Sequence, residues 1–343
     1  MKDISADYST PVGELGDILK LLIDAGQPAM VWGPPGIGKS QATHQVAVDT
    51  DRDYIDIRAL LLDPVDLRGI PWRDADDGNR TRWAPPAFLP PENGDGKYLI
   101  NLEELPAAPQ MVQTALYQLV LDRAIGEYKL PPGAALVACG NNASDRGVFH
   151  RMSPALASRF VHVDVTIDAG DWQNWAIGAD ITPEVIMFIR SKPDLLHAYD
   201  PDSSNMAFPC PRTWEFVSNI LKTRGDIRED LLHRVFVGTI GQGAAIDFTA
   251  YLQIWKSLPD WQTVIDDPHG VEIPENASVL IALCGALFSN ADDANFESIC
   301  VFANRLSKAG RIEVGEFLVG SCIRREPSLQ HSKHYIKWAV TTQ

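Results

Sequence analysis

The sequence predicts an α/β fold, in which a parallel five-stranded sheet is followed by a helical part. Apolar strand-like runs alternate with helix-like runs up to residue 168, which is typical of a parallel sheet covered by helices. A glycine-rich loop follows one of these strands. Beyond residue 168 the apolar residues recur at helical spacing. We therefore expect an αβ core over 1–168, a helical lid over 169–257 and a helical C-terminal extension over 258–343.

In the core, residues 11–25 carry apolar side chains at helical spacing, and residues 28–32 form a short apolar run that can be a buried strand. The other strands and helices are expected to alternate behind them. Strands are predicted over 54–58, 97–102, 134–139 and 160–165, and helices over 41–48, 109–123 and 153–158. The acidic stretch 72–78 is predicted to be a flexible loop.

The second half of the chain contains helical patterns separated by short breaks. Residues 258–274 hold three prolines and a glycine, so we expect a linker there. The mildly basic tail 323–343 is expected to be a solvated end. Helices are predicted over 171–178, 183–191, 211–222, 229–238, 244–257, 276–288, 296–309 and 313–322.

Composition limits the possible functions and locations. The formal net charge of −15 argues against a nucleic-acid binder, which usually carries the opposite balance. The five cysteines form no C-x-x-C pair, which favours reduced thiols in a cytoplasmic protein. The polar, acidic first residues do not resemble a signal peptide. No run approaches about 18 apolar residues, so no membrane span is expected.

The most specific motif is the stretch Gly33–Ser40, which fits the phosphate-loop pattern G-x-x-x-x-G-K-[ST] at every fixed position. The glycines let backbone N–H groups converge on a phosphate, and the following helix adds its positive end. Lys39 is expected to reach the β- and γ-phosphates of ATP, and the Ser40 hydroxyl to ligate Mg²⁺. The predicted nucleotide-binding residues are Gly33, Pro34, Pro35, Gly36, Ile37, Gly38, Lys39, Ser40 and Gln41.

Two acids, Glu103 and Glu104, end the apolar strand predicted over 97–102. In this Walker-B arrangement the first acid holds Mg²⁺ and the second polarises the attacking water. The usual first acid is aspartate, and the extra methylene of Glu103 changes its reach to the metal by about 1 Å. A displacement of that size can slow a reaction strongly. We therefore expect nucleotide binding, with hydrolysis that Glu103 could slow.

Three further polar residues stand where a nucleotide site would use them. Asn141, at the end of the strand 134–139, can hold the attacking water. Arg159, before the last core strand, can act as an arginine finger in a neighbouring subunit, with Arg151 and Arg146 as alternatives. Arg212 opens a helix of the lid and can contact the γ-phosphate.

Together these motifs resemble the MoxR group of AAA+ ATPases over roughly residues 10–225. The matching features are the Walker A loop, the acid pair followed by P-x-x-V-Q-x-A-L, Gly-Asn at 140–141, Ser-Arg-Phe at 158–160 and Pro-Arg at 211–212. The resemblance implies that Asn141 is sensor 1, Arg159 the arginine finger and Arg212 sensor 2. It also implies that residues 62–69 lead into a helix-2 insert containing 81–88, and that 124–130 form a hairpin before sensor 1.

The same resemblance implies that the chain is an AAA+ P-loop ATPase and chaperone that works as a homo-oligomeric ring, which in this family is a hexamer. Its implied partner is a von Willebrand factor A-type protein, which it would remodel or activate. One alternative is a nucleotide-switched scaffold with little turnover, favoured by Glu103 and by the unassigned helical extension. Another is a nucleic-acid-directed AAA+ motor, against which the net charge argues.

Overall fold

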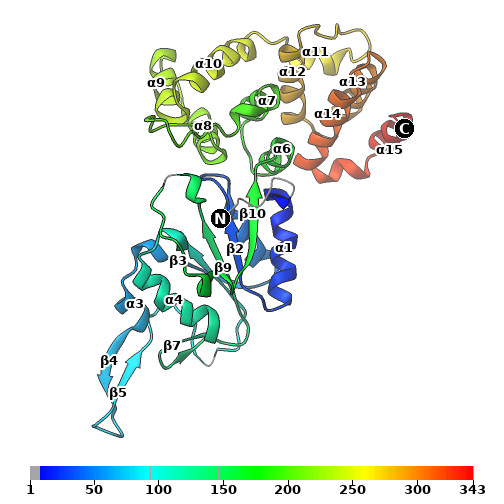
Figure 1. Ribbon diagram of the computed structural model, residues 1–343. Helices are drawn as coiled ribbons and strands as arrows, with labels where there is room; N and C mark the ends of the chain where they lie inside the picture. The colour runs from blue at the N-terminus through cyan, green and yellow to red at the C-terminus, as the bar shows by residue number, and fades with distance from the viewer. Residues whose placement is uncertain (1–7, 93, 146, 343) are drawn as a thin grey trace. The chain divides into compact units, whose positions relative to one another are not determined.

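The computed structural model describes residues 8–92, 94–145 and 147–342. The chain forms two compact units, residues 1–168 and 169–343 (Figure 1). Arg146, one alternative for the arginine finger, and the first residues, which do not resemble a signal peptide, lie outside the described residues.

Unit 1 contains a six-stranded sheet in the order β1-β10-β2-β9-β6-β3, and all of its pairings are parallel. The five predicted strands are present, so the α/β fold class is confirmed. The sixth strand, β1, has two residues and pairs with the edge of β10. The strands are β1 (Thr10–Pro11), β2 (Ala29–Trp32), β3 (Asp53–Arg58), β6 (Tyr98–Glu103), β9 (Ala134–Gly140) and β10 (Val161–Thr166).

Successive residues of the central strands enter different cores, because side chains alternate between the two faces of a strand. In β2, Met30 packs into one hydrophobic core and Val31 into the other. Helices α1 (Val12–Asp24) and α2 (Lys39–Asp49) cover the face of Val31, and α4 (Gln110–Asp122) covers the face of Met30. Both faces are buried, which explains why the strands read as continuous apolar runs.

The insert between β3 and β6 differs from one expectation. Residues 72–78 were expected to form a loop, but Trp72 and Arg73 belong to β4 (Ile70–Arg73), which pairs antiparallel with β5 (Thr81–Ala84). Asp74 stabilises the turn, because its buried carboxylate accepts hydrogen bonds from two backbone N–H groups and from Arg82. The hairpin projects from the sheet of unit 1 (Figure 1).

The remaining short elements of unit 1 include a hairpin and a helix that the sequence predicted, and a short helix, α3, that it did not. The hairpin expected over 124–130 is formed by β7 and β8. Helix α5 begins after Ser153, whose hydroxyl accepts a hydrogen bond from the Leu156 N–H at 3.2 Å and so caps the helix. These elements are α3 (Pro64–Arg68), α5 (Pro154–Ala157), β7 (Ala124–Ile125) and β8 (Tyr128–Lys129).

Unit 2 is helical, and every helix predicted for it is present. One expectation was wrong: the proposed linker contains α11 (Trp261–Asp266), which Asp260 caps and whose Val264 is fully buried. The basic tail contains α15 (Lys333–Thr342), and most of its described residues are exposed, although Leu329 before the helix is buried. The other helices are α6 (Ala169–Gly178), α7 (Pro183–Ser191), α8 (Pro211–Thr223), α9 (Glu229–Ile240), α10 (Gln242–Lys256), α12 (Ala277–Ser289), α13 (Phe296–Lys308) and α14 (Ile312–Arg325).

Aromatic rings and one close helix contact organise the core of unit 2. Phe188 lies 5.3 Å from Trp214 and 5.0 Å from Phe248, measured between ring centroids. At Gly285 of α12, a Cβ atom would lie 2.6 Å from Met187 Cγ of α7, so only glycine permits this approach. Helices from both sides of the proposed boundary at residue 258 are therefore packed together, and that boundary stays a prediction. None of the helices described here is long and apolar enough to cross a membrane.

Candidate nucleotide-binding site

The phosphate loop lies between β2 and α2, as its motif requires. Gly36 and Gly38 have φ values of 80° and 99°, in the left-handed region that favours glycine. At Gly33 a Cβ atom would lie 2.8 Å from Ile37 Cδ1 and 2.9 Å from the Val165 carbonyl oxygen. Glycine is thus needed at each of these three positions for steric or conformational reasons. The loop ends at the first turn of α2, where the exposed Ser40 follows Lys39.

Lys39 is buried, with 8 % of its surface exposed, and its ammonium group is held by three oxygen atoms. It donates to the carbonyl oxygens of Gly33 at 2.8 Å and Pro34 at 2.9 Å. It also donates to Oδ1 of Asn141 at 3.0 Å. The predicted Walker A lysine and the predicted sensor residue are therefore in contact, although 102 positions separate them in the sequence.

The sheet topology explains this contact. Strands β2 and β9 are neighbours, with Trp32 opposite Gly140, so the residues that follow them meet at the same edge of the sheet. The Gly33 N–H donates to the Gly140 carbonyl oxygen at 3.3 Å and extends the pairing by one step. A Cβ atom at Gly140 would lie 2.5 Å from the Pro106 ring, so this strand end also requires glycine.

Glu103 is the last residue of β6, and a neighbour that the sequence analysis missed fixes its carboxylate. The side-chain amide of Asn101 donates to Glu103 Oε1 at 2.5 Å and to the Tyr54 hydroxyl at 2.9 Å. Asn101 is fully buried and lies on the same face of the strand as Glu103, since the two are two positions apart. A polar residue inside an otherwise apolar strand was the signal that could have revealed it.

A buried thiol lies behind the same edge of the sheet. The Thr43 hydroxyl of α2 and Cys139 Sγ of β9 lie 3.8 Å apart. Burial, reinforced by the charge of Glu103, raises the pKa of the Cys139 thiol to about 12. Cys139 is therefore a neutral packing residue near neutral pH and not a nucleophile.

Glu104 differs from Glu103 in both conformation and exposure. Its φ of 56° places its backbone in the left-handed region, which a residue other than glycine adopts at a cost. The side chain is exposed directly after β6. Strained backbone of this kind often occurs at functional sites, where it sets the direction of a side chain.

Arg159 contacts residues of its own protomer. Its guanidinium donates to the Ala155 carbonyl oxygen at 2.5 Å and lies 4.7 Å from the centroid of the Tyr117 ring. The contact with Tyr117 is a cation–π interaction. The alternative Arg151 is exposed, and the other, Arg146, lies outside the described residues.

A short chain of hydrogen bonds connects the strand before the phosphate loop with the segment that carries Arg159. The Trp32 indole N–H donates to His162 Nδ1 at 2.8 Å, and His162 Nε2 lies 2.9 Å from the Ala157 carbonyl oxygen. Because Nδ1 accepts from the indole, the ring proton lies on Nε2 and is donated to Ala157. The two rings are also stacked, with their planes 13° apart.

The other predicted site residues are accessible. Gln41 is exposed on the first turn of α2. Arg212 is exposed on the first turn of α8 and belongs to unit 2. The structure thus brings together the phosphate loop and Asn141, and it places Glu103 at the end of β6, between β3 and β9, with Glu104 directly after it.

No protein-family model matches the chain, and a search of the curated proteins finds no match. Among solved structures, the chain is similar to RuvB of Thermotoga maritima, described as a Holliday junction branch migration motor, with 15 % identity over 75 % of this chain and 74 % of that one and a TM-score of 0.41. It is also similar to NtrX of Brucella abortus, with 13 % identity over 87 % of this chain and 67 % of that one and a TM-score of 0.38.

These neighbours are AAA+ proteins. The chain has the expected AAA+ P-loop type of fold, a parallel sheet flanked by helices and followed by a helical part. The strand order and the positive φ angles of the phosphate loop carry that assignment.

Proposed function

We propose that the chain is a MoxR-like AAA+ ATPase that binds ATP and Mg²⁺ and remodels or activates a partner protein. The contact between Lys39 and Asn141 carries the proposal, because it joins a phosphate loop to a polar strand end at one edge of a parallel sheet. Ligands of open α/β sheets bind at this edge, where the strands end.

The groups around the loop fit a magnesium-bound triphosphate. Lys39 supplies a cation, the loop and the first turn of α2 supply N–H donors, and Ser40 supplies a hydroxyl. A carboxylate of Glu103 and a hydroxyl are the hard oxygen ligands that Mg²⁺ accepts. When bound, ATP would supply the γ-phosphoryl group for hydrolysis.

We propose the following roles for the residues of this site. Lys39 would orient the phosphates, and Glu103, held by Asn101, would help to position the metal. Glu104 would accept a proton from the attacking water, and Asn141 would orient that water. We propose from the motif order that Arg212 couples the nucleotide state to the helical lid.

Nucleotide binding is tested by Lys39→Ala. We expect the affinity for ATP to fall at least about 10-fold, because a charge-assisted contact with phosphate is lost. Calorimetric titration measures it, and Lys20→Ala is the matched control because Lys20 forms a surface ion pair with Asp49 on α2. Wild-type affinity in Lys39→Ala would overturn the proposed site.

We further propose that the active form is a homo-oligomeric ring, expected to be a hexamer, in which Arg159 completes the site of the neighbouring protomer. Arg159→Ala should abolish ATP turnover while ATP binding persists, since a finger acts on transition-state charge. Tyr117→Leu is the control, because it removes the ring under Arg159 and leaves the guanidinium. Phosphate release and particle mass, measured together, test the proposal.

A nucleotide-switched scaffold with little turnover is the second candidate. Glu103 in the place of the usual aspartate favours it, as does the attachment of Arg159 to its own protomer. A well-formed ring that releases no phosphate would support the scaffold and not the ATPase.

The partner and the location are proposals of the same kind. The resemblance to the MoxR group favours a von Willebrand factor A-type protein as the partner, and the extension 258–343 as a docking element. All five cysteines are free and buried, which supports a reducing compartment such as the cytoplasm.

A further inference from the structure

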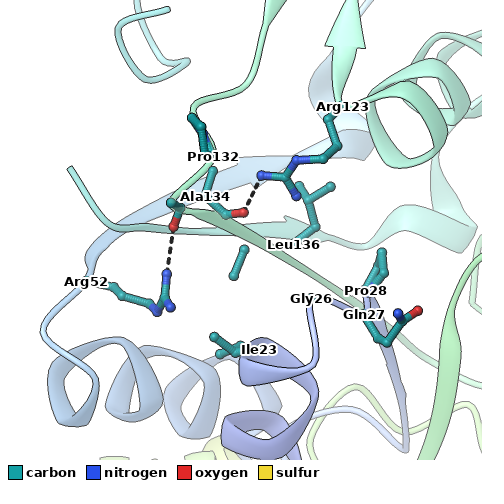
Figure 2. A pocket seen from close by; sticks show the side chains of 11 residues that line it. Ile23, Gly26, Gln27, Pro28, Arg52, Arg123, Pro132, Ala134 and Leu136 are labelled. Carbon is teal, nitrogen blue, oxygen red and sulfur yellow. Dashed lines mark hydrogen bonds between the residues drawn. The ribbon is translucent and has the colours of Figure 1, made fainter. Parts of the chain in front are cut away.

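A small pocket lies at the end of the unit 1 sheet opposite the phosphate loop (Figure 2). Its volume is about 120 Å³, and it is lined by the residues that precede β2 and by the start of β9. Pro28 lines the pocket before β2, whereas Gly33 follows that strand on the nucleotide side. At about 3.3 Å per residue, the five steps from Pro28 to Gly33 span roughly 16 Å, so this pocket is separate from the candidate nucleotide site.

Two arginines from different elements enter this pocket, and both are held at the start of β9 (Figure 2). Arg52 Nη1 donates to the Gly133 carbonyl oxygen at 2.7 Å. Arg123 Nη2 donates to the carbonyl oxygens of Pro131 at 3.0 Å and Ala134 at 2.5 Å. These hydrogen bonds fix the positions of both guanidinium groups without neutralising their charge.

Neither guanidinium forms an ion pair with an acid within the described part of the chain. The acids beside them in the sequence, Asp51, Asp53 and Asp122, are exposed. The chain has 45 acidic residues against 30 basic ones, so acids to pair with these arginines are plentiful. Two positive charges therefore share one pocket without a balancing carboxylate.

The hydrogen-bonding capacity of the arginines is also incompletely used. The buried Nε of Arg52 has no acceptor among the described residues. A guanidinium offers five N–H donors in a planar fork, which matches the oxygens of phosphate or carboxylate groups. Ile23 and Leu136 form apolar parts of the wall, and a less polar surrounding strengthens the attraction between opposite charges.

Burial lowers the pKa of the Arg123 guanidinium, as is expected when a charge is partly desolvated without an acidic partner. Its backbone has a φ of 52° at the end of α4, a conformation that glycine usually adopts at this position. Arg123 is thus held beside the pocket although its charge is partly desolvated and its backbone is in the left-handed region.

We propose that this pocket binds a single phosphate group between Arg52 and Arg123. A phosphate with a charge near −2 matches two guanidinium groups better than one carboxylate does. A volume of about 120 Å³ is below the range of sites that hold a whole drug-sized molecule and suits one such group. The phosphate is either free inorganic phosphate or the terminal group of a phosphomonoester.

The test titrates inorganic phosphate into the full chain carrying Lys39→Ala, so that the phosphate loop contributes as little as possible. We expect one saturable site, and at least a 10-fold weaker affinity when Arg52→Gln or Arg123→Gln is added. Arg58→Gln is the control, because Arg58 is exposed on β3, forms an ion pair with Asp56 and does not line the pocket. The proposal would be overturned if adding either glutamine substitution to the Lys39→Ala chain left its affinity for phosphate unchanged.

A second measurement does not depend on substitutions in the pocket. Phenylglyoxal modifies accessible arginines, and peptide mapping shows which ones react. Phosphate should protect Arg52 and Arg123 at least 10-fold and leave Arg58 reactive; equal reaction with and without phosphate contradicts the proposal. Phosphoserine in a parallel titration separates the sources, since its binding indicates a phosphomonoester and its exclusion indicates the free ion. Acetate binding as tightly as phosphate would overturn the assignment to phosphate.

Discussion

The side-chain amide of Asn101 donates to Glu103 Oε1 at 2.5 Å, from a position two residues earlier on the same face of β6. Glutamate has one methylene more than the aspartate usual at the proposed Walker-B position, and its carboxylate could otherwise extend further from the strand. The amide holds that carboxylate close to the strand. Asn101 and Glu103 are therefore best understood as a pair, and the pair offsets the longer side chain.

Removing the amide should impair turnover more than binding. In Asn101→Leu, which keeps the same number and branching of side-chain heavy atoms, we expect kcat for ATP hydrolysis to fall about 10-fold, since a metal ligand displaced by about 1 Å costs rate. The affinity for ATP should stay within about twofold. Steady-state phosphate release and calorimetry measure the two quantities. Tyr54→Phe is the control, because it removes only the hydroxyl that accepts the second amide hydrogen, and an equal loss in both variants would contradict the pairing.

Substitutions at Glu104 should change stability and ATP hydrolysis differently, because the backbone of this residue is left-handed. Glu104→Gly should raise the free energy of unfolding of unit 1 by about 1 kcal/mol, because glycine adopts a φ of 56° without steric cost. Glu104→Gln retains the strain and should leave stability nearly unchanged. Both variants should bind ATP and fail to hydrolyse it. Urea unfolding and phosphate release provide the measurements, and a glycine variant that is less stable than the glutamine variant would refute the strain argument.

The cysteines should be unreactive in the folded protein. Burial raises the pKa of the Cys139, Cys284 and Cys300 thiols to about 12 in each case, so the reactive thiolate is scarce near pH 8. Ellman's reagent should modify none of the five thiols until guanidinium chloride unfolds the chain, and then all five. Ser257→Cys, at an exposed position, should react at once and serves as the control. Rapid reaction of a native thiol would contradict this prediction.

Glu184 should make unit 2 less stable as the pH rises. Burial raises the pKa of its carboxyl above the ordinary 4.5, so the folded state holds the proton more tightly than the unfolded chain does. Stability from this group is complete below pH 4.5 and is lost as the pH rises through the folded pKa. Glu184→Gln should therefore raise the urea midpoint at pH 7 and leave it unchanged near pH 4. Glu316→Gln, exposed on α14, is the control, and a midpoint that rises equally at both pH values would exclude this explanation.

Strands and helices of unit 1 could be predicted from the sequence because their signals are local. The apolar run before Gly33 and the helical spacing over 11–25 each reflect burial against one sheet. The contact between Lys39 and Asn141 could be anticipated only through the motif, since it depends on which strands are neighbours.

The features that the sequence did not reveal depend on long-range packing or on single side chains. The hairpin β4–β5 was missed because the buried Asp74 stabilises an acidic turn that appears unstructured by composition. Helix α11 was missed because prolines flank it, although the cap at Asp260 marks its start. Asn101 and the two arginines of the pocket became visible only when their partners on other strands and loops were placed.

The hydrogen bonds from Trp32 through His162 to Ala157 link two segments of unit 1. One segment leads into the phosphate loop, and the other ends two residues before Arg159. In a ring of the proposed kind, each protomer would receive phosphate at one face and offer its arginine at the other. Occupancy of one protomer would thus be transmitted to the next, and ATP consumption by such a ring would rise cooperatively with ATP concentration.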